Sequence, residues 1–591
     1  MSHAARRDKR QLRLPFLLSK RLRHDRPVSS SSAPIPALVT SDAARSLPRV
    51  ALLLLCAAYV LPGVFGRDPW KNADLTAFGQ MLAMAEGRTS WLVPALGGVP
   101  TDSPPLPNWL GAAFIMLTSP WVDPSLAVRI PFALLLAATL AALWYASFAL
   151  ARTEAAQPLP FAFGGEAQGV DYARAIADAS ILALVATLGL LQLGHETTPE
   201  LVQLAAVAAA QWALAVAPYH ARRARIGIVL SLPILACSGA PTMAAVLGVA
   251  GAAICARSTY PGVHRFGWWV AGSTALACVT AALLGQWAWR VTPPNAPLQL
   301  LHIARQWLWF LWPAWLLALY ALWRWRRFLS RRHVAIPLSV LITALAANLA
   351  MGGSDRALML GLPGVAVLAA FALPTLNRST SSAIDWFSVF FFTLLALWVW
   401  VMYVAMQTGV PAKPAANVQR LAPGFKAQFA WLPLLVATVA TLAWLWLVRW
   451  RTARHRAAIW RSLVIPAGGV VLAWTLTMTL WLQPLDYARS YRAHMALLAK
   501  HIPPGVCITA PGLPRALTAA LEYHGRWRVD ARPEAAGSGE CPVWVKAGTI
   551  AKPPDTPAGW QAVAIERRPT DKDEVTGVYR RAGAPGAAPL Q

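Results

Sequence analysis

The sequence predicts an α-helical polytopic membrane protein, with about thirteen transmembrane helices followed by a small C-terminal α/β domain. Of its 591 residues, 57% are apolar and only 13% are charged, a balance that argues against a chain of ordinary soluble domains. The 29 tryptophans agree, because their amphipathic rings are stable where a membrane meets water. The six cysteines are too sparse for a disulfide scaffold, and none stands in a CxxC pair that would indicate zinc or a redox centre.

Apolar stretches long enough to cross a bilayer define a membrane region over residues 50–482. A bilayer core of about 30 Å needs roughly 20 helical residues for each crossing. Each stretch ends at charged residues or at proline and glycine, and residues 238–241 predict a tight turn between the short fifth span and the sixth. The expected spans are residues 50–66, 126–150, 175–193, 200–217, 226–237, 241–256, 267–289, 306–323, 334–350, 357–376, 384–405, 430–448 and 463–482.

The distribution of the positive charge along the chain predicts the orientation of these spans. The sequence has 53 Lys and Arg against 26 Asp and Glu, which in a soluble protein would suggest binding to nucleic acid. Here the basic residues concentrate in residues 1–49, 222–225, 324–332 and 449–461, which all fall on one side of the predicted membrane. Because basic loops stay in the cytoplasm, we expect a cytoplasmic N-terminus, a periplasmic C-terminus and no nucleic-acid partner.

The two ends of the chain differ from the membrane region. Residues 1–49 contain a serine run and scattered prolines, which predict a disordered, basic cytoplasmic extension. Residues 484–591 combine clustered charges with Pro/Gly turns and short apolar runs, and therefore predict a soluble periplasmic α/β domain. Cys507 and Cys541 lie in this domain on the oxidising side, where a disulfide and two buried thiols are both open alternatives.

A long outer loop over residues 67–125 separates the first two spans. Residues 75–86 place Phe78, Leu82 and Ala85 on one face of a helix, and residues 109–117 form a second apolar run that is too short to cross a membrane. We expect two short helices lying on the membrane surface. Carboxylates at such outer positions are the first candidates for function, because charge beside or inside a membrane is costly.

The spacing within this loop is distinctive. Asp74, Trp91, the Val-Pro pair at 93–94, the Pro-Pro-Leu-Pro run at 104–107 and Trp109 follow one another at intervals that resemble the first periplasmic loop of the lipid A aminoarabinose transferases. These enzymes belong to the protein O-mannosyltransferase-like superfamily, glycosyltransferase family 39 and related, which has the GT-C fold. The resemblance extends over most of residues 50–482 and implies the same fold here.

Two further segments resemble the same family. Residues 197–201 are similar to its Thr-x-Asp-x-Leu segment, and residues 354–364 are similar to its Arg-Tyr-x-Leu-Pro segment before the tenth span. The first loop also departs from the family: Leu75 replaces its glutamate, Phe78 its tyrosine, and Ser103 a lysine that is expected to hold the lipid phosphate. The donor, or the way its phosphate is bound, is therefore expected to differ, with Ser103 as the substrate-binding candidate at this position. Lys71 is either the replacement cation or an ordinary surface lysine.

The resemblance assigns catalytic roles to two carboxylates. Asp74 is expected to take the proton of the acceptor as the anomeric carbon is attacked, because inverting glycosyl transfer needs a base. The alternative is that Asp74 simply caps a helix, a common role for aspartate. Glu200 follows Pro199 at the start of the fourth span and is either the second catalytic carboxylate or an acidic residue that stabilises a helix N-terminus.

Substrate binding is assigned to residues close to these carboxylates. Arg356 is expected to hold the leaving lipid phosphate, because a guanidinium forms paired hydrogen bonds to phosphate oxygens; the alternative is an interface arginine paired with Asp355. Glu196 and His195 either join the same site or lie on its outer rim. No metal-ligand spacing or nucleotide-binding glycine loop is evident, so we expect no cofactor and leave a divalent metal open.

The resemblance implies an inner-membrane glycosyltransferase that moves a sugar from a polyprenyl-phosphate carrier to lipid A or another envelope glycan at the periplasmic face. Nucleotide sugars are absent there, so the activated sugar must arrive on a lipid whose phosphate leaves. Transfer to protein by the same fold, a lipid or sugar transporter and an inactive relative are the alternatives. The polar candidate site residues lie at the outer ends of spans, and the sequence shows no internal repeat. Both observations argue against a transporter.

Overall fold

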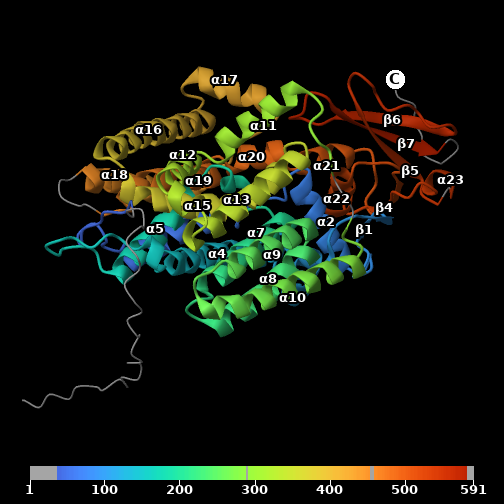
Figure 1. Cartoon of the computed structure of the whole chain (residues 1–591). Helices are drawn as coiled ribbons and strands as arrows, with labels where there is room; N and C mark the ends of the chain where they lie inside the picture. Colours follow the sequence, from blue (N-terminus) through green and yellow to red (C-terminus); the bar gives the residue numbers. More distant parts are fainter. Residues whose placement is uncertain (1–35, 288–290, 453–457, 539, 582–591) are drawn as a thin grey trace, which may run out of the picture. The chain divides into compact units, whose positions relative to one another are not determined.

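The computed structural model describes residues 36–287, 291–452, 458–538 and 540–581. Within this part of the chain, a large helical region is followed by a small domain built on a β-sheet (Figure 1). The predicted fold class, a helical membrane protein with a C-terminal α/β domain, is confirmed.

Every expected span contains a helix. Seven helices in the described part of the chain are long and apolar enough to cross a membrane by length and composition, namely α4, α7, α10, α13, α16, α18 and α19. The helices at the expected spans are α1 (Arg49–Val60), α4 (Pro124–Ala151), α5 (Gly169–Ala186), α7 (Pro199–Val216), α8 (Ala221–Cys237), α9 (Pro241–Ala256), α10 (Pro261–Leu283), α12 (Ala314–Arg324), α13 (Arg332–Ala350), α15 (Leu362–Ala372), α16 (Arg378–Thr408), α18 (Trp431–Thr452) and α19 (Arg461–Leu480).

Proline starts several of these helices. Helices α4, α7, α9 and α10 begin with proline, whose fixed φ suits the first helical position and whose missing N–H would have no partner there. Helix α4 packs against α5 and α7, and α8 packs against α7 and α10. A second group of contacts joins α12 to α15, and α16 and α18 to α19. The buried core between these helices consists largely of Ala, Leu and Val.

Three expected spans are broken rather than continuous. The eighth is divided into α11 (Pro297–Phe310) and α12, because Pro313 has no N–H to continue the helical hydrogen bonds. The third continues beyond α5 as the separate short helix α6 (Leu190–Leu193), and the tenth begins with the short helix α14 (Asp355–Met359) before α15. These last two breaks carry the candidate site residues.

The predicted disorder of residues 1–49 is wrong for its last part. Residues 1–35 lie outside the described residues, whereas Ala37 and Val39 are buried and bond through their backbone carbonyls to Leu159 and Ala167. The backbone N–H of Leu47 donates to Asp178. This segment has no helical or strand periodicity, and its order comes from pairing with a distant loop that a local pattern cannot predict.

Both helices predicted in the first loop are present, as α2 (Ala73–Ala85) and α3 (Pro105–Thr118), with a hairpin of β1 (Ala95–Leu96) and β2 (Val99–Pro100) between them. Helix α2 is, however, not a free surface helix. A Cβ added at Gly79 would lie 2.5 Å from the Cβ of Ala519, so α2 packs closely against a helix of the C-terminal domain. The rings of Phe78 and Tyr523 meet edge to face in the same contact.

The C-terminal domain is the predicted α/β unit. Its sheet has the order β4-β3-β5-β7-β6, in which β3 runs parallel to both of its neighbours and β5, β7 and β6 are antiparallel. Cys507 and Cys541 form a disulfide, which decides between the two open alternatives. The elements after α19 are α20 (Leu482–Arg489), α21 (Arg492–Leu498), β3 (Cys507–Thr509), α22 (Arg515–Tyr523), β4 (Arg528–Asp530), α23 (Ala535–Ser538), β5 (Val543–Thr549), β6 (Trp560–Arg567) and β7 (Glu574–Arg581).

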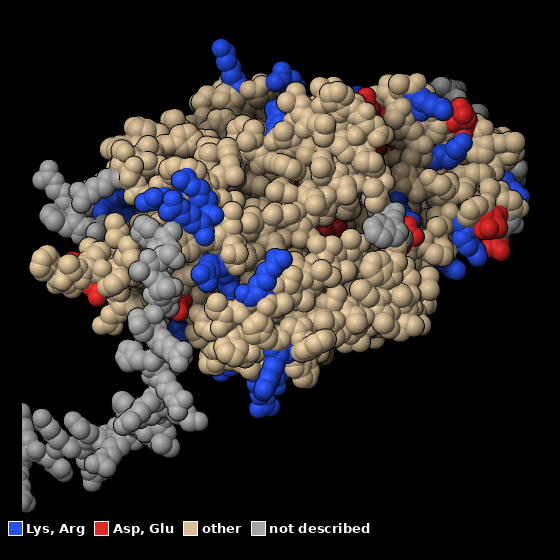
Figure 2. Space-filling view, in the orientation of Figure 1, with Lys and Arg blue, Asp and Glu red and all other residues tan. Residues whose placement is uncertain are grey.

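The surface charge follows this division. On the face shown in Figure 2, most of the helical region carries few charged side chains, as expected for a surface that contacts lipid. Basic side chains gather toward the left of the view, and mixed charge lies over the C-terminal domain at the right. The amphipathic helix α17 (Ala412–Leu421) follows α16 and buries none of its residues.

Candidate active site

The first turn of α2 places Asp74 in a buried position. The chain reaches this turn through Asn72, whose φ of 71° with ψ of −123° is a conformation that only glycine adopts easily. The neighbouring backbone N–H of Lys71 donates to the carbonyl of Arg489, 2.8 Å away. The backbone that leads to Asp74 is therefore held in place by the segment before the C-terminal domain, which contains Arg489.

Both oxygens of Asp74 are fully engaged. Oδ2 accepts from Nη2 of Arg67 at 3.2 Å and from the backbone N–H of Trp70 at 3.1 Å, while Oδ1 accepts from the backbone N–H and the hydroxyl of Thr197 at 2.8 and 2.9 Å. The helix-cap alternative is wrong, because Asn72 holds the cap position and Asp74 binds Thr197 in the loop between α6 and α7. Asp74 joins the first loop to the start of α7.

Two buried arginines set the charge of Asp74. Burial alone would raise its pKa, but Arg67, Arg129 and the hydrogen bonds from Thr197 and Trp70 hold the pKa of this carboxyl below its usual value. Arg67 also donates to the carbonyl of His195 at 2.7 Å and stacks on the Trp70 ring. Arg129 was not predicted from the sequence, although an arginine inside an apolar span is a recognisable signal.

A second cluster surrounds Arg356, on α14. Its Nη2 donates to Glu196 Oε2 at 2.5 Å, and its Nη1 donates to Glu200 Oε2 at 3.2 Å and to the Thr198 hydroxyl at 2.9 Å. The predicted alternative partner, Asp355, makes no ion pair with Arg356 among the described residues. Arg356 is instead neutralised by two carboxylates, Glu196 in the loop before α7 and Glu200 in the first turn of α7.

The two clusters form one site. Thr197 binds Asp74 and the next residue, Thr198, binds Arg356, so adjacent positions of one loop serve both groups. Burial and the negative charge of Asp74 raise the pKa of Glu196, and its remaining oxygen accepts from Gln192 at 3.0 Å. Sequence reasoning predicted that Asp74, Glu200 and Arg356 belong together and left Glu196 either in this site or on its rim. The structure brings the four side chains together, with Glu196 paired to Arg356.

Only part of this site is open to a ligand. The side chains of Asp74 and Glu196 are 2% and 5% exposed, whereas those of Glu200 and Arg356 are 25% and 22% exposed. A ligand can therefore reach one carboxylate and one guanidinium directly. Asp74 can accept a proton only after one of its four hydrogen bonds opens.

His195 precedes Glu196 and is buried. Its ring nitrogens approach the carbonyl oxygens of Leu191 and Tyr59, each at 2.8 Å, and its ring contacts Trp474. Burial lowers the pKa of His195 to about 4, an effect that outweighs these carbonyls and that Arg67 reinforces. We therefore interpret His195 as a buried positioning residue, in place of the predicted role in binding substrate.

Lowering the pH is expected to destabilise the protein through His195. Because its pKa falls from 6.5 when unfolded to about 4 when folded, the unfolded chain gains a proton first, and stability falls as the pH drops between these values. The shift corresponds to about 3 kcal/mol. Thermal unfolding of the wild type and of His195→Gln from pH 7 to pH 4 should show a smaller loss in the variant. An equal loss in both proteins would contradict the assignment.

The side chains of Lys71 and Ser103 have partners outside these clusters. The Lys71 ammonium pairs with Asp571 at 3.0 Å, which ties the first loop to the C-terminal domain. The Ser103 hydroxyl accepts from Asn108 at 3.1 Å, just before α3. Among the described residues, neither side chain forms a hydrogen bond or ion pair with Asp74 or Arg356. Their predicted roles in phosphate binding thus gain no support from these contacts.

Among the described residues, no group of three or more His, Cys, Asp or Glu side chains is arranged to hold one metal ion. The charged groups that the site does offer are carboxylates paired with guanidinium groups, which can take up a proton and bind an anion such as phosphate.

The chain resembles known proteins in its three-dimensional structure. No protein-family model and no curated protein sequence matches the chain. Two solved structures of ArnT from Cupriavidus metallidurans do match. The structure bound to undecaprenyl phosphate has a TM-score of 0.58 at 13% identity, covering 92% of this chain and 99% of ArnT. The apo structure has a TM-score of 0.59 at 13% identity, covering 90% and 97%. The chain therefore has the ArnT fold, which confirms the predicted GT-C fold.

Proposed function

We propose that this protein is an inner-membrane glycosyltransferase that moves a sugar from a polyprenyl-phosphate carrier to an acceptor at the periplasmic face. One observation carries the proposal. In a chain with the ArnT fold, Arg356 and Glu200 are partly exposed and paired at 3.2 Å, so a cation suited to phosphate lies beside a carboxylate suited to a proton. That the ArnT neighbour was solved with undecaprenyl phosphate supports the class of donor.

The pairing suggests how binding of the donor prepares the base. The donor phosphate competes with Glu200 for Arg356, because both are anions that seek the same guanidinium. Once released, the Glu200 carboxylate has an oxygen free to accept a proton from the acceptor. Glu196 is the less exposed partner, and keeps Arg356 in place during the exchange.

In the transfer step, the acceptor hydroxyl attacks the anomeric carbon and gives its proton to Glu200, while the bond from that carbon to the phosphate oxygen breaks. The lipid phosphate leaves with the electron pair, and Arg356 stabilises its charge. Asp74, already ionised and saturated by hydrogen bonds, holds Arg67 and Thr197, so that Glu196 in the loop and Glu200 at the start of α7 keep their positions.

Mass spectrometry of envelope glycolipids tests the proposal. A strain lacking the protein would be complemented with wild type, Asp74→Asn or Glu200→Gln at equal protein levels. We expect a sugar-mass increment only with the wild type, and in vitro a rate about 10²–10⁴-fold lower for Glu200→Gln. The accumulated product identifies lipid A or another glycan as the acceptor. An increment on proteins alone would favour the protein O-glycosyltransferase alternative. Identical profiles for the three complemented strains would refute the roles of Asp74 and Glu200, and no increment with the wild type would refute transfer to these acceptors.

A further inference from the structure

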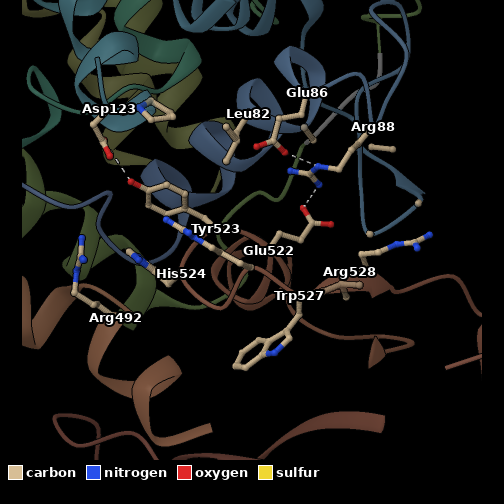
Figure 3. Close-up of a pocket in the computed structure, with 17 residues that line it drawn as sticks. Leu82, Glu86, Arg88, Asp123, Arg492, Glu522, Tyr523, His524, Trp527 and Arg528 are labelled. Carbon is tan, nitrogen blue, oxygen red and sulfur yellow. Dashed lines mark hydrogen bonds and ion pairs between the residues drawn. The ribbon is translucent and has the colours of Figure 1, made fainter. Parts of the chain in front are cut away.

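A second cavity lies outside the candidate active site, between the first loop and the C-terminal domain (Figure 3). Its volume is about 800 Å³, within the range of ligand-binding pockets. Its walls come from the C-terminal end of α2, the β1–β2 hairpin, the start of α4 and the segment from α22 to β4. Neither the resemblance nor the proposed transfer step uses this cavity.

The walls of the cavity are fixed to one another. The close packing of Gly79 on Ala519 joins α2 to α22 beside the cavity. The backbone N–H of Ala531 donates to the carbonyl of Gly97 at 2.8 Å, which attaches the hairpin to the end of β4. The cavity therefore lies between segments that pack directly against one another.

Cations without partners line one part of the cavity. Arg526 and Arg528 are exposed, and no hydrogen bond or ion pair engages their guanidinium groups within the described residues. Arg526 is presented at a backbone φ of 53°, which non-glycine residues seldom adopt. By contrast, Arg88 is already paired with Glu86 and Glu522, as the dashed lines in Figure 3 show. Two free guanidinium groups make a site for an anion.

Hydrogen-bonding groups of both kinds line the rest. Glu86 and Glu522 each use one oxygen to accept from Arg88, and Asp123 uses Oδ1 to accept from Ser125 and, at 3.4 Å, from the Tyr523 hydroxyl. No hydrogen bond engages the second oxygen of Glu86 or of Asp123 within the described residues, so these oxygens can accept from a ligand. Nε2 of His524 is buried without a partner among the described residues. A cavity for a bare anion would exclude carboxylates, and one for an acyl chain would be apolar. Alternating donors and acceptors suit hydroxyl groups, each of which donates and accepts.

We propose that this cavity binds an anionic saccharide, with Arg526 and Arg528 contacting its negative group and the carboxylates contacting its hydroxyls. The proposal rests on the proposed function in identifying the ligand as the distal part of the acceptor. From Asp74, the cavity residues Leu82 and Glu86 lie about 12 and 18 Å farther along the axis of α2. An acceptor that occupies both places must be extended, with its reacting hydroxyl far from its anionic group.

One residue connects the cavity to the active site. Arg492 lines the cavity and pairs with Asp68, whose neighbour Arg67 binds Asp74. The backbone N–H of Asp68 also donates to Asp486 on α20. An anion in the cavity can therefore bind the Arg492 guanidinium, which also pairs with Asp68 in the loop before Asp74. The C-terminal domain thereby gains a role in binding the acceptor.

Ligand binding to the full chain in detergent tests the proposal. The probes are trehalose 6-phosphate, unmodified trehalose and inorganic phosphate, and binding is followed by saturation-transfer NMR without donor. We expect trehalose 6-phosphate to bind more tightly than either of the others. Arg526→Ala with Arg528→Ala should raise its dissociation constant about tenfold or more. The control, Lys500→Ala with Lys552→Ala, removes two exposed charges of the same domain outside the cavity and should leave binding unchanged.

The outcomes separate this site from the proposed function. Equal binding of inorganic phosphate and trehalose 6-phosphate would overturn a saccharide site, and equal weakening by the control pair would overturn the assignment to Arg526 and Arg528. Glu200→Gln should bind the probe as the wild type does, whatever its effect on transfer. Absence of sugar transfer in every strain, with probe binding intact, would refute only the link to the acceptor.

Discussion

Replacing Asp74 with alanine is expected to lower the free energy of unfolding by about 3–5 kcal/mol and to abolish sugar transfer. The carboxylate is the buried partner of Arg67, whose side chain has no exposed surface. Its removal leaves the guanidinium with a single acceptor, the His195 carbonyl, and leaves the Thr197 N–H and hydroxyl without the acceptor they now share. Unpaired buried charge is the largest single cost that a point mutation can create here.

A double variant distinguishes charge pairing from a general loss of packing. Arg67→Ala combined with Asp74→Ala removes both charges, so it should be less destabilised than the sum of the two single variants. Thermal unfolding in detergent measures stability, and transfer to the identified acceptor measures activity. We expect the double variant to recover stability without recovering transfer. A fully additive pair would show that Arg67 and Asp74 contribute independently, against the geometry.

The sequence predicted the parts of this site that are local. The spacing around Asp74 in the first loop, the acidic start of α7 and the Arg356 segment each form a short pattern, and each lies where the pattern indicated. Their partners could not be predicted, because these depend on how distant helices pack. Arg356 is 160 positions from Glu196 in the chain, and no local signal favoured that carboxylate over the adjacent Asp355.

Other contacts of the first loop were equally out of reach of local patterns. The role of Lys71 as a phosphate ligand stays a prediction, and its observed partner Asp571 lies 500 residues away in the C-terminal domain. The surface placement of α2 failed because its amphipathic pattern does not say whether lipid or protein covers the apolar face. The break at Pro313 could have been predicted, since proline inside an apolar span is a recognised cause of helix interruption.

Replacing Arg356 with alanine is expected to slow transfer by about 10²–10³-fold, the usual effect of removing one group that stabilises a developing negative charge. Arg356→Lys should recover part of the rate, because an ammonium keeps the charge but not the paired hydrogen bonds. Arg305→Ala is the matched control, since it removes an exposed cation from α11, which contacts α14, and Arg305 pairs with neither carboxylate in the described structure. Steady-state kinetics with the lipid-linked donor measures the effect.

A loss of rate in Arg356→Ala has two possible causes, because the same guanidinium neutralises Glu196 and Glu200. Without it, the pKa of Glu196, already raised by burial, rises further, and the site could fail through altered protonation alone. Arg356→Ala combined with Glu196→Gln removes that effect by deleting the buried carboxylate charge. If Arg356 holds the leaving phosphate, the double variant stays slow at every pH. If the arginine only balances charge, the double variant recovers the wild-type rate, and the cation that binds phosphate must be sought elsewhere.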